Sequence, residues 1–381
     1  MDFNLSSEQQ MIFETARNFG AEEIAPHAYD WEKAETIPKD MLAKAGALGF
    51  GAIYVPEEQG GMGLSRLDAT LVFEALAMAC PSISGFISIH NMTTNMVAHY
   101  GSDALKAEWL DLMIGLQVYA SYCLTEPGSG SDAAALRTRA DRSNTGYRLN
   151  GTKAFISGGS YADLYVTMVR TGEDGPKGIS TIVVPDGAKG LSFGALEQKM
   201  GWRAQPTTQV QFDDCDVPAE NLLGEEGAGF TYAMEGLDGG RLNIAACSLG
   251  AAQAAMNIAL DYMGERTAFG KTLDQFQALQ FKLAEMETDL NAARVFLRQA
   301  ATKLDEGAAD ATKYCAMAKL FVTDKCYDIT NDALQLLGGY GYLEDYKIEK
   351  LLRDIRVHQI LEGTNQIMRL IISRAMLAEK G

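Results

Sequence analysis

A single carboxylate near the C-terminus, Glu362, is the first candidate for chemistry in this chain. It follows the apolar pair Ile360-Leu361 and precedes Gly363-Thr364. Apolar surroundings raise the pKa of a carboxyl group by desolvation, which makes a glutamate a useful base near neutral pH. The glycine permits close approach of backbone to a ligand, and the threonine offers a hydroxyl group. Taken alone, the segment is better explained as a helix end with an ordinary surface glutamate, so the rest of the chain must decide.

A glycine- and serine-rich run at residues 122–132 is the second candidate. Its Gly128-x-Gly130-x-x-Ala133 spacing formally satisfies the dinucleotide fingerprint. A proline lies in the turn, however, and the short stretch 135–140 follows in place of a crossover helix. A nicotinamide Rossmann site is therefore disfavoured, although free backbone N–H groups in such a loop still suit a phosphate or the edge of a flavin ring.

Two further segments offer partners for a planar ligand. In residues 150–159, Phe155 supplies an aromatic plane and Ser157 a hydroxyl group beside glycines, although a strand running into a turn explains this pattern better on local grounds. The glycine turn at 338–342 is explained equally well by ligand approach and by a plain helix stop.

His358 is interpreted as a structural histidine. We find no Ser-His-Asp or Cys-His arrangement, so hydrolase chemistry has no support.

The composition bounds the class of protein. A chain of 381 residues predicts two or three domains. The net charge of −17 argues against nucleic acid and anionic membrane surfaces as partners. Six scattered cysteines without a CxxC pair, with only four histidines, predict free thiols and no metal site.

The first residues resemble neither a secretory signal nor a transit peptide, and no apolar run approaches about 20 residues. We expect a cytoplasmic protein, or a mitochondrial matrix protein if this is a mature eukaryotic form.

Changes in the pattern of apolar and turn-forming residues divide the chain into three expected domains. Residues 1–119 show helical spacing of apolar side chains, residues 120–229 show short β-rich runs between turn signals, and residues 230–381 return to long amphipathic helices. We therefore expect a mainly α protein with a β-domain: an N-terminal helical domain, a central antiparallel β-barrel or sandwich, and a C-terminal four-helix bundle. The predicted helices are 8–19, 38–48, 68–79, 241–264, 274–306 and 311–337, and the predicted strands are 146–149, 164–169, 178–184 and 207–212.

Taken together and in order, these segments resemble the acyl-CoA dehydrogenase family of flavoenzymes. The similarity runs from the first helix to the last, and within the family it is strongest to members that act on isobutyryl-CoA. The matching segments are 122–132, 153–159, 266–270, 335–341 and 359–369, supported by 87–92, 175–180, 201–207 and 241–251.

The resemblance implies FAD as cofactor, an acyl-CoA thioester as substrate and a role for each matching residue. Glu362 takes the place of the catalytic base, and Ser157 is implied to lie near flavin N5. Arg266, Phe276 and Gln277 are implied to reach the FAD of a neighbouring subunit. The implied FAD contacts are Tyr122, Leu124, Thr125, Gly130, Ser131, Phe155, Ile156, Ser157, Arg266, Phe276, Gln277, Gln335, Leu336, Gly338, Gly339, Thr364 and Gln366. The implied substrate contacts, mostly to CoA, are Ser131, Asp238, Arg241, Gly363 and Arg374.

The implied reaction is α,β-dehydrogenation of the thioester. Glu362 would remove the α-proton while a hydride leaves the β-carbon for flavin N5, and the enolate-like charge on the carbonyl oxygen would need electrostatic stabilisation. An electron-transfer flavoprotein is the implied acceptor, and a homotetramer arranged as a dimer of dimers is the implied assembly.

The expected substrate is a short branched acyl-CoA, with isobutyryl-CoA going to methacrylyl-CoA in valine breakdown. Leu361 stands where medium-chain relatives carry tyrosine, which agrees with short and branched-chain members. Some relatives carry the acid on another helix, near position 241; because that residue is arginine here, Glu362 is the candidate base. The alternatives are a butyryl- or 2-methylbutyryl-CoA dehydrogenase, an acyl-CoA oxidase and, more remotely, a non-catalytic flavin- or CoA-binding scaffold.

Overall fold

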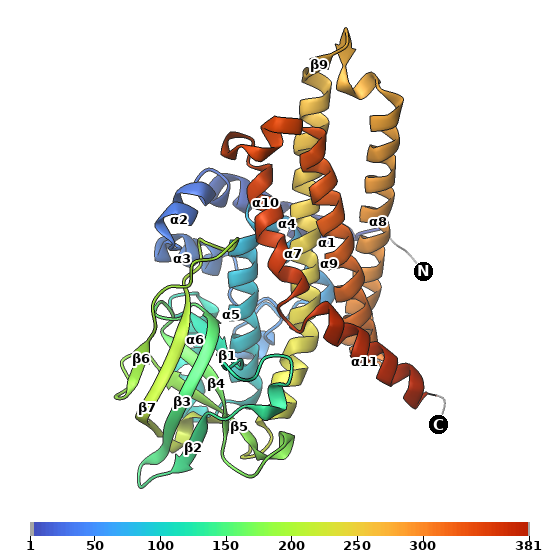
Figure 1. The fold of residues 1–381 in the computed structure, drawn as a ribbon. Coiled ribbons are helices and arrows are strands. Elements are labelled where there is room, and N and C mark those ends of the chain that lie inside the picture. The colour runs from blue at the N-terminus through green and yellow to red at the C-terminus, as the bar shows by residue number, and fades with distance from the viewer. Residues whose placement is uncertain (1–3, 380–381) are drawn as a thin grey trace.

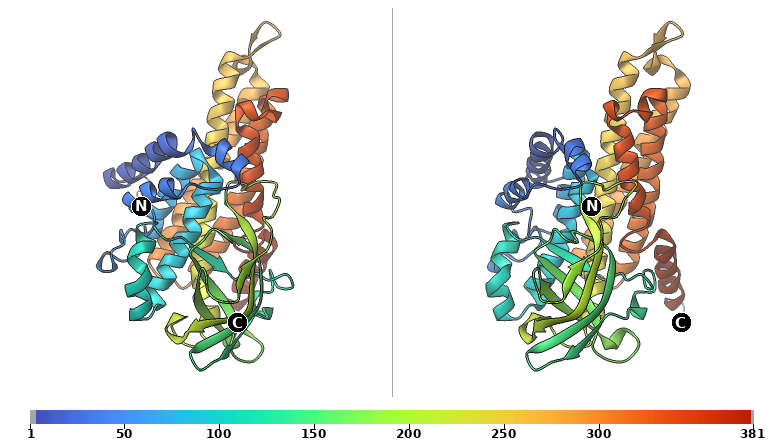
Figure 2. Two further views of the ribbon diagram at one scale, coloured as in Figure 1. Left: turned by 90° about the vertical axis from the view of Figure 1, so that its left-hand side faces the viewer. Right: turned by 60° about the vertical axis from the view of Figure 1, so that its left-hand side comes forward.

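The computed structural model describes residues 4–379 and has the expected mainly α class with a β-domain (Figure 1). The chain passes through N-terminal helices, then a sheet, then long helices. Figure 2 shows the sheet curling at one end of the molecule, while the long helices extend away from it and the N-terminal helices lie beside them.

The N-terminal part consists of six α-helices joined by short turns. A capping box starts the first of them, because the Ser6 hydroxyl accepts from Gln9 N and the Gln9 side chain accepts from Ser6 N. Ser65 and Asp68 form the same arrangement at the start of α4. The helices are α1 Ser7–Phe19, α2 Ala28–Ala34, α3 Lys39–Ala47, α4 Arg66–Ala79, α5 Pro81–Tyr100 and α6 Asp103–Ile114.

The central part is an eight-stranded sheet in which antiparallel pairing dominates. The strand order is β6-β7-β3-β2-β4-β5-β8, with β1 paired to β4. Both β1 and β2 pair with β4 in parallel, which the predicted antiparallel sheet did not include. Neither reaches β4 through a hairpin, so the chain is free to approach in parallel. The strands are β1 Ala120–Cys123, β2 Arg139–Arg142, β3 Gly146–Ser157, β4 Leu164–Arg170, β5 Ile179–Pro185, β6 Leu191–Phe193, β7 Thr207–Pro218 and β8 Leu222–Leu223.

The C-terminal part is a bundle of α7, α8, α9 and α10, with α11 lying against α9 (Figure 1). The predicted amphipathic helix 274–306 corresponds to α8, and its apolar side chains Met286, Leu290 and Ala293 are buried. A small hairpin, β9–β10, joins α7 to α8. The elements are α7 Gly229–Glu265, β9 Thr267–Ala268, β10 Lys271–Thr272, α8 Gln277–Asp305, α9 Ala311–Leu336, α10 Ile348–Ile355 and α11 Asn365–Ala378.

Helix α7 is the central helix of the molecule. By length and composition it could cross a bilayer, but 78% of its most apolar window is buried inside the fold, as in a core helix. At Gly250 it crosses α4 so closely that a Cβ would lie 2.0 Å from the Glu74 carbonyl oxygen. The close crossing therefore requires glycine.

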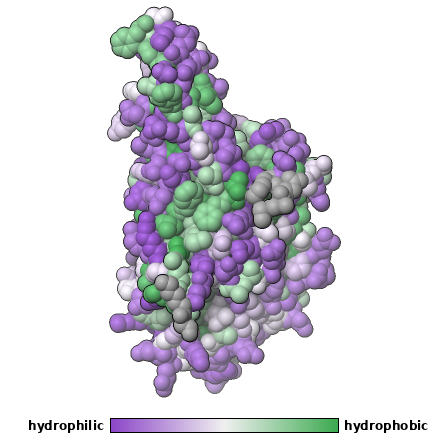
Figure 3. Space-filling model, turned by 90° about the vertical axis from the view of Figure 1, so that its right-hand side faces the viewer, coloured by the Kyte–Doolittle hydropathy of each residue, from purple (hydrophilic) through white to green (hydrophobic). Residues whose placement is uncertain are grey.

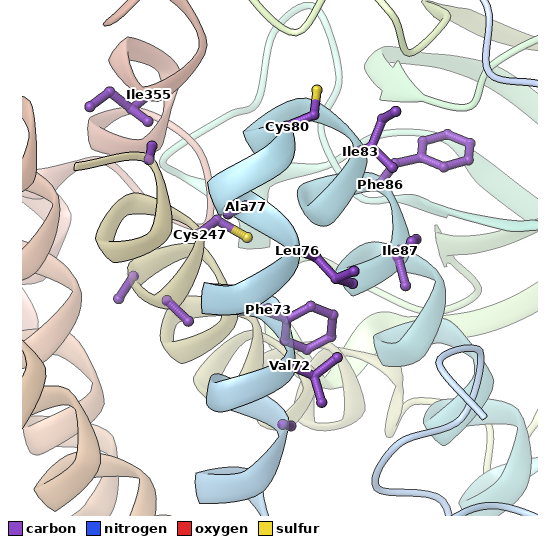
Figure 4. Packing of buried hydrophobic residues seen from close by; sticks show 14 of the residues in the cluster. Val72, Phe73, Leu76, Ala77, Cys80, Ile83, Phe86, Ile87, Cys247 and Ile355 are labelled. Carbon is purple, nitrogen blue, oxygen red and sulfur yellow. The ribbon is translucent and has the colours of Figure 1, made fainter. Parts of the chain in front are cut away.

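The N-terminal helices and the bundle share one hydrophobic core (Figure 4). Phe73 and Leu76 of α4, Phe86 of α5, Cys247 of α7 and Ile355 of α10 all belong to it. Because α7 packs against both α4 and α9, the part of α7 that faces the sheet is held firmly in place.

Candidate active site

Glu362 lies in a tight turn between α10 and α11. Its φ is 55°, and that of Gly363 is 86°, so two consecutive residues adopt left-handed backbone conformations. The Thr364 side chain ends the turn by accepting a hydrogen bond from Ile367 N at 3.2 Å, which caps α11. A left-handed glutamate costs of order 1–3 kcal/mol and persists only where the surroundings over-determine it, as functional sites often do.

The Glu362 carboxylate is directed inward, onto α7. Its Oε2 is buried and has no hydrogen-bond partner within residues 4–379. It lies against Gly240, where a Cβ would be 2.6 Å from Oε2. Tyr122 at the end of β1 lines the same space, and its hydroxyl donates to the Ala233 carbonyl oxygen at 3.3 Å. An unpartnered buried carboxylate oxygen is free to accept a proton from a ligand.

Burial, opposed by two nearby cations, brings the pKa of the Glu362 carboxyl close to neutral pH. Burial raises its pKa to about 7, against the opposing effect of the cations Arg241 and Lys319. Arg241 on α7 donates from Nε to the Glu362 carbonyl oxygen at 3.3 Å and pairs with Asp238 at 2.5 Å. The arrangement therefore suits a general base that operates at physiological pH.

Two residues of this site carried no individual role in the sequence analysis. Gly240 lies between Asp238 and Arg241, which the resemblance assigned to the substrate. Its packing against Glu362 is a contact between segments distant in sequence, which a sequence does not reveal. Lys319 left a signal, because it is a single lysine on an otherwise apolar face of α9, between Cys315 and Val322. It is fully buried, with 0% exposure.

The predicted flavin-ring segments lie side by side in the sheet. Ala154 N donates to the Thr125 carbonyl oxygen at 2.8 Å, which joins the loop after β1 to β3. The Ser121 hydroxyl donates to the Ser157 carbonyl oxygen at 2.7 Å. Phe155 lies at an irregularity of β3, with φ 57° and 68% exposure, so an aromatic face is presented to the outside by strained backbone.

The loop after β1 is secured by a buried ion pair. Lys153 Nζ of β3 lies 2.8 Å from Glu126 Oε1 and also donates to the Leu124 carbonyl oxygen. Glu126 accepts two further hydrogen bonds, from the backbone N–H groups of Arg137 and Thr138. The exposed part of the loop, which contains Gly130 and Ser131, is open: a Cβ at Gly130 would meet no atom within 4 Å.

Other predicted contacts lie far from Glu362 in the same chain. Arg266, Phe276 and Gln277 are at the hairpin end of the bundle, and Figure 1 shows β9 at the opposite end of the molecule from the sheet. The end of α9, with Gln335, Leu336, Gly338 and Gly339, lies there too, since Arg266 is 5.5 Å from the ring of Tyr340. Gln366 and Arg374 are exposed on α11.

His358 is a structural histidine, as predicted. It is fully buried; its Nδ1 lies 2.8 Å from the Ser248 hydroxyl, and its Nε2 accepts from the Trp202 indole at 3.2 Å. Burial lowers the pKa of His358 to about 3, so the ring stays neutral.

Comparison with known proteins gives the class of this three-part fold, which is that of an oxidoreductase family. Family models for the N-terminal, middle and C-terminal domains of acyl-CoA dehydrogenases match residues 6–116, 121–215 and 227–377. The chain belongs to the acyl-CoA dehydrogenase family.

Individual relatives narrow the comparison. Mitochondrial isobutyryl-CoA dehydrogenase of Bos taurus is 52% identical over 375 residues, covering 98% of this chain and 90% of the relative. The solved butyryl-CoA dehydrogenase of Megasphaera elsdenii has a TM-score of 0.95 at 36% identity, covering 99% of this chain and all of the other. A solved structure described as an electron transferring flavoprotein of Acidaminococcus fermentans contains a chain with a TM-score of 0.95 at 41% identity and the same coverage.

FAD is the cofactor of this family. The residues present fit it: Phe155 offers an exposed ring face, and glycines in the loop after β1 and at the hairpin end of the bundle leave space. A Cβ at Gly128, Gly338 or Gly339 would meet no atom within 4 Å. These open positions lie in the segments that the resemblance assigned to FAD.

Proposed function

We propose that this protein oxidises a short branched acyl-CoA, isobutyryl-CoA first, to its α,β-unsaturated thioester, with Glu362 as the base. One observation carries the proposal: Glu362 Oε2 is buried without a partner, and burial raises the pKa of the carboxyl to about 7. A non-catalytic scaffold would have no use for such a group. The named isobutyryl-CoA relative, at 52% identity, supports the choice of substrate.

In the proposed reaction Glu362 Oε2 accepts the α-proton of the thioester. When bound, FAD supplies the acceptor for the hydride that leaves the β-carbon. Arg241 holds the Glu362 carbonyl oxygen and so keeps the carboxylate directed at the substrate. Gly240 keeps the space beside the carboxylate free, and Tyr122 closes the same space with a neutral phenol, which limits access of water.

We also propose the remaining site assignments. Tyr122, Leu124, Thr125, Gly130 and the segment 155–157 would hold FAD, with Ser131 shared between FAD and CoA. Asp238, Arg241, Gly363 and Arg374 would contact the substrate. Thr364 and Gln366 would complete the FAD site, together with Arg266, Phe276, Gln277, Gln335, Leu336, Gly338 and Gly339 of a neighbouring copy.

A homotetramer would bring the hairpin-end residues to the FAD of another copy, which one chain alone does not achieve. Figure 3 supports an interface: apolar side chains gather near the middle of the face that carries α8. Large exposed apolar residues of α8 and α11 include Phe281, Val295, Leu370, Met376 and Leu377. We propose an electron-transfer flavoprotein as acceptor, which the description of the A. fermentans structure supports. We propose the cytoplasm as compartment, or the mitochondrial matrix, which the name of the bovine relative supports.

A substrate panel tests the proposed function. Purified FAD-loaded protein would be assayed with isobutyryl-, butyryl- and 2-methylbutyryl-CoA, scoring kcat/KM for reduction of a one-electron acceptor and, separately, hydrogen peroxide formation. We expect the highest kcat/KM with isobutyryl-CoA and little peroxide. A higher kcat/KM for butyryl-CoA would move the assignment to the straight-chain members, to which the M. elsdenii structure belongs by name. Peroxide equal to substrate consumed would identify an oxidase.

A further inference from the structure

Two consecutive carbonyl oxygens in the Glu362 turn are each held by a buried cation from a different helix. Arg241 Nε of α7 donates to the Glu362 oxygen at 3.3 Å, and Lys319 Nζ of α9 donates to the Gly363 oxygen at 2.8 Å. Both residues of the turn have positive φ. Because such backbone needs external support, the two cations are what hold the turn in this conformation.

Lys319 differs from Arg241 in how its charge is balanced. Arg241 forms an ion pair with Asp238. Lys319 is fully buried and donates to two neutral oxygens, the Gly363 carbonyl and Asn365 Oδ1, both at 2.8 Å. Among the ion pairs of the described chain, none includes Lys319. A buried ammonium without a carboxylate partner is costly, so its presence beside the base indicates a function.

Asn365 extends this contact into α9. Its Nδ2 donates to Thr323 Oγ1 at 3.0 Å and to Asp324 Oδ1 at 2.6 Å. Two successive turns of α9 therefore hold the Gly363–Asn365 segment: Lys319 binds both of its ends, and Thr323 and Asp324 bind Asn365.

The groups that face Glu362 come from three elements. Arg241 lies on α7, Lys319 on α9 and Tyr122 on β1. Burial, followed by the Glu362 charge, raises the pKa of Tyr122 well above its ordinary value, so the phenol stays neutral. Burial lowers the pKa of Lys319 to about 7, although Glu362 opposes that change. His358, behind Lys319, is neutral because its pKa is far below 7. Glu362 and Lys319 are therefore the pair that titrates near pH 7.

We propose that Lys319 is a positioning residue for the base: it fixes the Glu362–Gly363 turn and supplies the unpaired positive charge that favours the ionised carboxylate. The proposal rests on the role of Glu362 proposed above. The sign of the Lys319 charge gives the direction of its effect on the pKa of Glu362. A base works when deprotonated, so removal of the Lys319 charge raises the pKa of Glu362 and moves the acid limb of the rate profile to higher pH.

The first test is the pH profile of kcat/KM for the FAD-loaded enzyme. We expect the Lys319→Met midpoint to rise by about one pH unit, a tenfold loss at acid pH, because one nearby opposite charge shifts a carboxyl pKa by that much or more. The loss should shrink above pH 8, where Lys319 of the wild type is itself neutral. Lys319→Arg retains the charge and should retain the midpoint. Lys282→Met removes a half-exposed lysine of α8 and should change neither midpoint nor rate.

The second test measures the turn directly, without substrate. We expect hydrogen exchange of the amides at 360–366 to accelerate in Lys319→Met and in Asn365→Ala, which keeps the lysine charge but removes one of its acceptors. Asn365→Ala should lower kcat while its pH midpoint stays that of the wild type, because the charge is unchanged.

A Lys319→Met midpoint that coincides with the wild-type midpoint, or unchanged exchange at 360–366, would overturn the proposal. If Lys319→Met does not fold, Asn365→Ala decides: wild-type exchange and wild-type kcat would overturn it equally. A Glu362→Gln enzyme with undiminished activity would instead remove the proposed function, whatever the Lys319 variants do.

Discussion

The Glu362 carboxylate lies over Gly240, where the absence of a side chain leaves the space that Oε2 occupies. Burial pushes the carboxyl toward the protonated form, and Arg241 and Lys319 oppose that effect. Both the place and the charge of the base therefore depend on neighbours that are more than 40 positions away in sequence. Without the two cations, burial would raise the pKa of the Glu362 carboxyl further and favour its protonated form.

Gly240→Ala should lower the rate of flavin reduction by substrate by about 100-fold, because a displacement of about 1 Å at a reacting group has that effect. The added Cβ would lie 2.6 Å from Oε2, so the carboxylate must move. Stopped-flow absorbance measures the rate, and the visible spectrum checks that FAD content is unchanged. Gly264→Ala, also on α7, adds a Cβ that meets nothing within 4 Å and serves as the control. Equal rates in the two variants would contradict the contact.

At the scale of elements, the sequence predicted the helices and strands in which apolar residues are buried and polar residues are exposed. Helices α1 and α9 begin and end close to the predicted positions, because Ser6 caps the first and the glycines at 338–339 follow the second. Helix α5 was not predicted, since its buried face carries polar residues such as His90 and Asn91. Their partners are on other elements: Asn91, for example, accepts from Ile53 N and donates to the Phe50 carbonyl oxygen. Burial of that kind leaves no periodic signal.

The residues of the candidate site also fall into a group that the sequence singled out and a group that it did not. Residue type and nearby glycines made Glu362 and Phe155 candidates, and only the family resemblance gave them roles; the structure shows both in left-handed backbone. Gly240 and Lys319 were not given roles, because their importance lies in contacts between α7, α9 and the turn. Spacing within one segment predicts which residue could react; it does not reveal what holds that residue in place.

Lys153→Met should destabilise the sheet by about 3–5 kcal/mol, because it leaves Glu126 buried without its ion-pair partner. Urea unfolding followed by tryptophan fluorescence measures the loss. The double variant Lys153→Met/Glu126→Gln removes the unpaired charge and should recover part of it. A double variant less stable than Lys153→Met would show that the loop after β1 is held mainly by other contacts.

At the scale of the molecule, the residues assigned to FAD lie at two separate ends of the folded structure. Phe155 belongs to the sheet, while Arg266 and Phe276 belong to the hairpin end of the bundle. At the tip of that hairpin Phe269 is 97% exposed, with φ 52°. A fully exposed aromatic side chain in strained backbone is expected to be covered by a partner, and another copy of this chain would also complete the FAD site.

Phe269→Ser should therefore weaken assembly and FAD retention together. Light scattering should give four times the mass of one chain for the wild type and a smaller mass for the variant at low concentration, with a faster release of FAD on dilution. Leu112→Ser changes another exposed apolar residue, on α6, and should affect neither property. A Phe269→Ser protein with unchanged mass and unchanged FAD release would contradict the proposed contact.

The most direct test of the central claim is the reaction of FAD-loaded Glu362→Gln with isobutyryl-CoA under anaerobic conditions. Glutamine keeps the size and most contacts of the side chain but cannot accept the α-proton, and loss of a general base costs about 100- to 10,000-fold in rate. We predict that bleaching of the flavin slows by at least about 100-fold while FAD content and thermal stability remain near those of the wild type. Bleaching at the wild-type rate would contradict the assignment of Glu362 as the base.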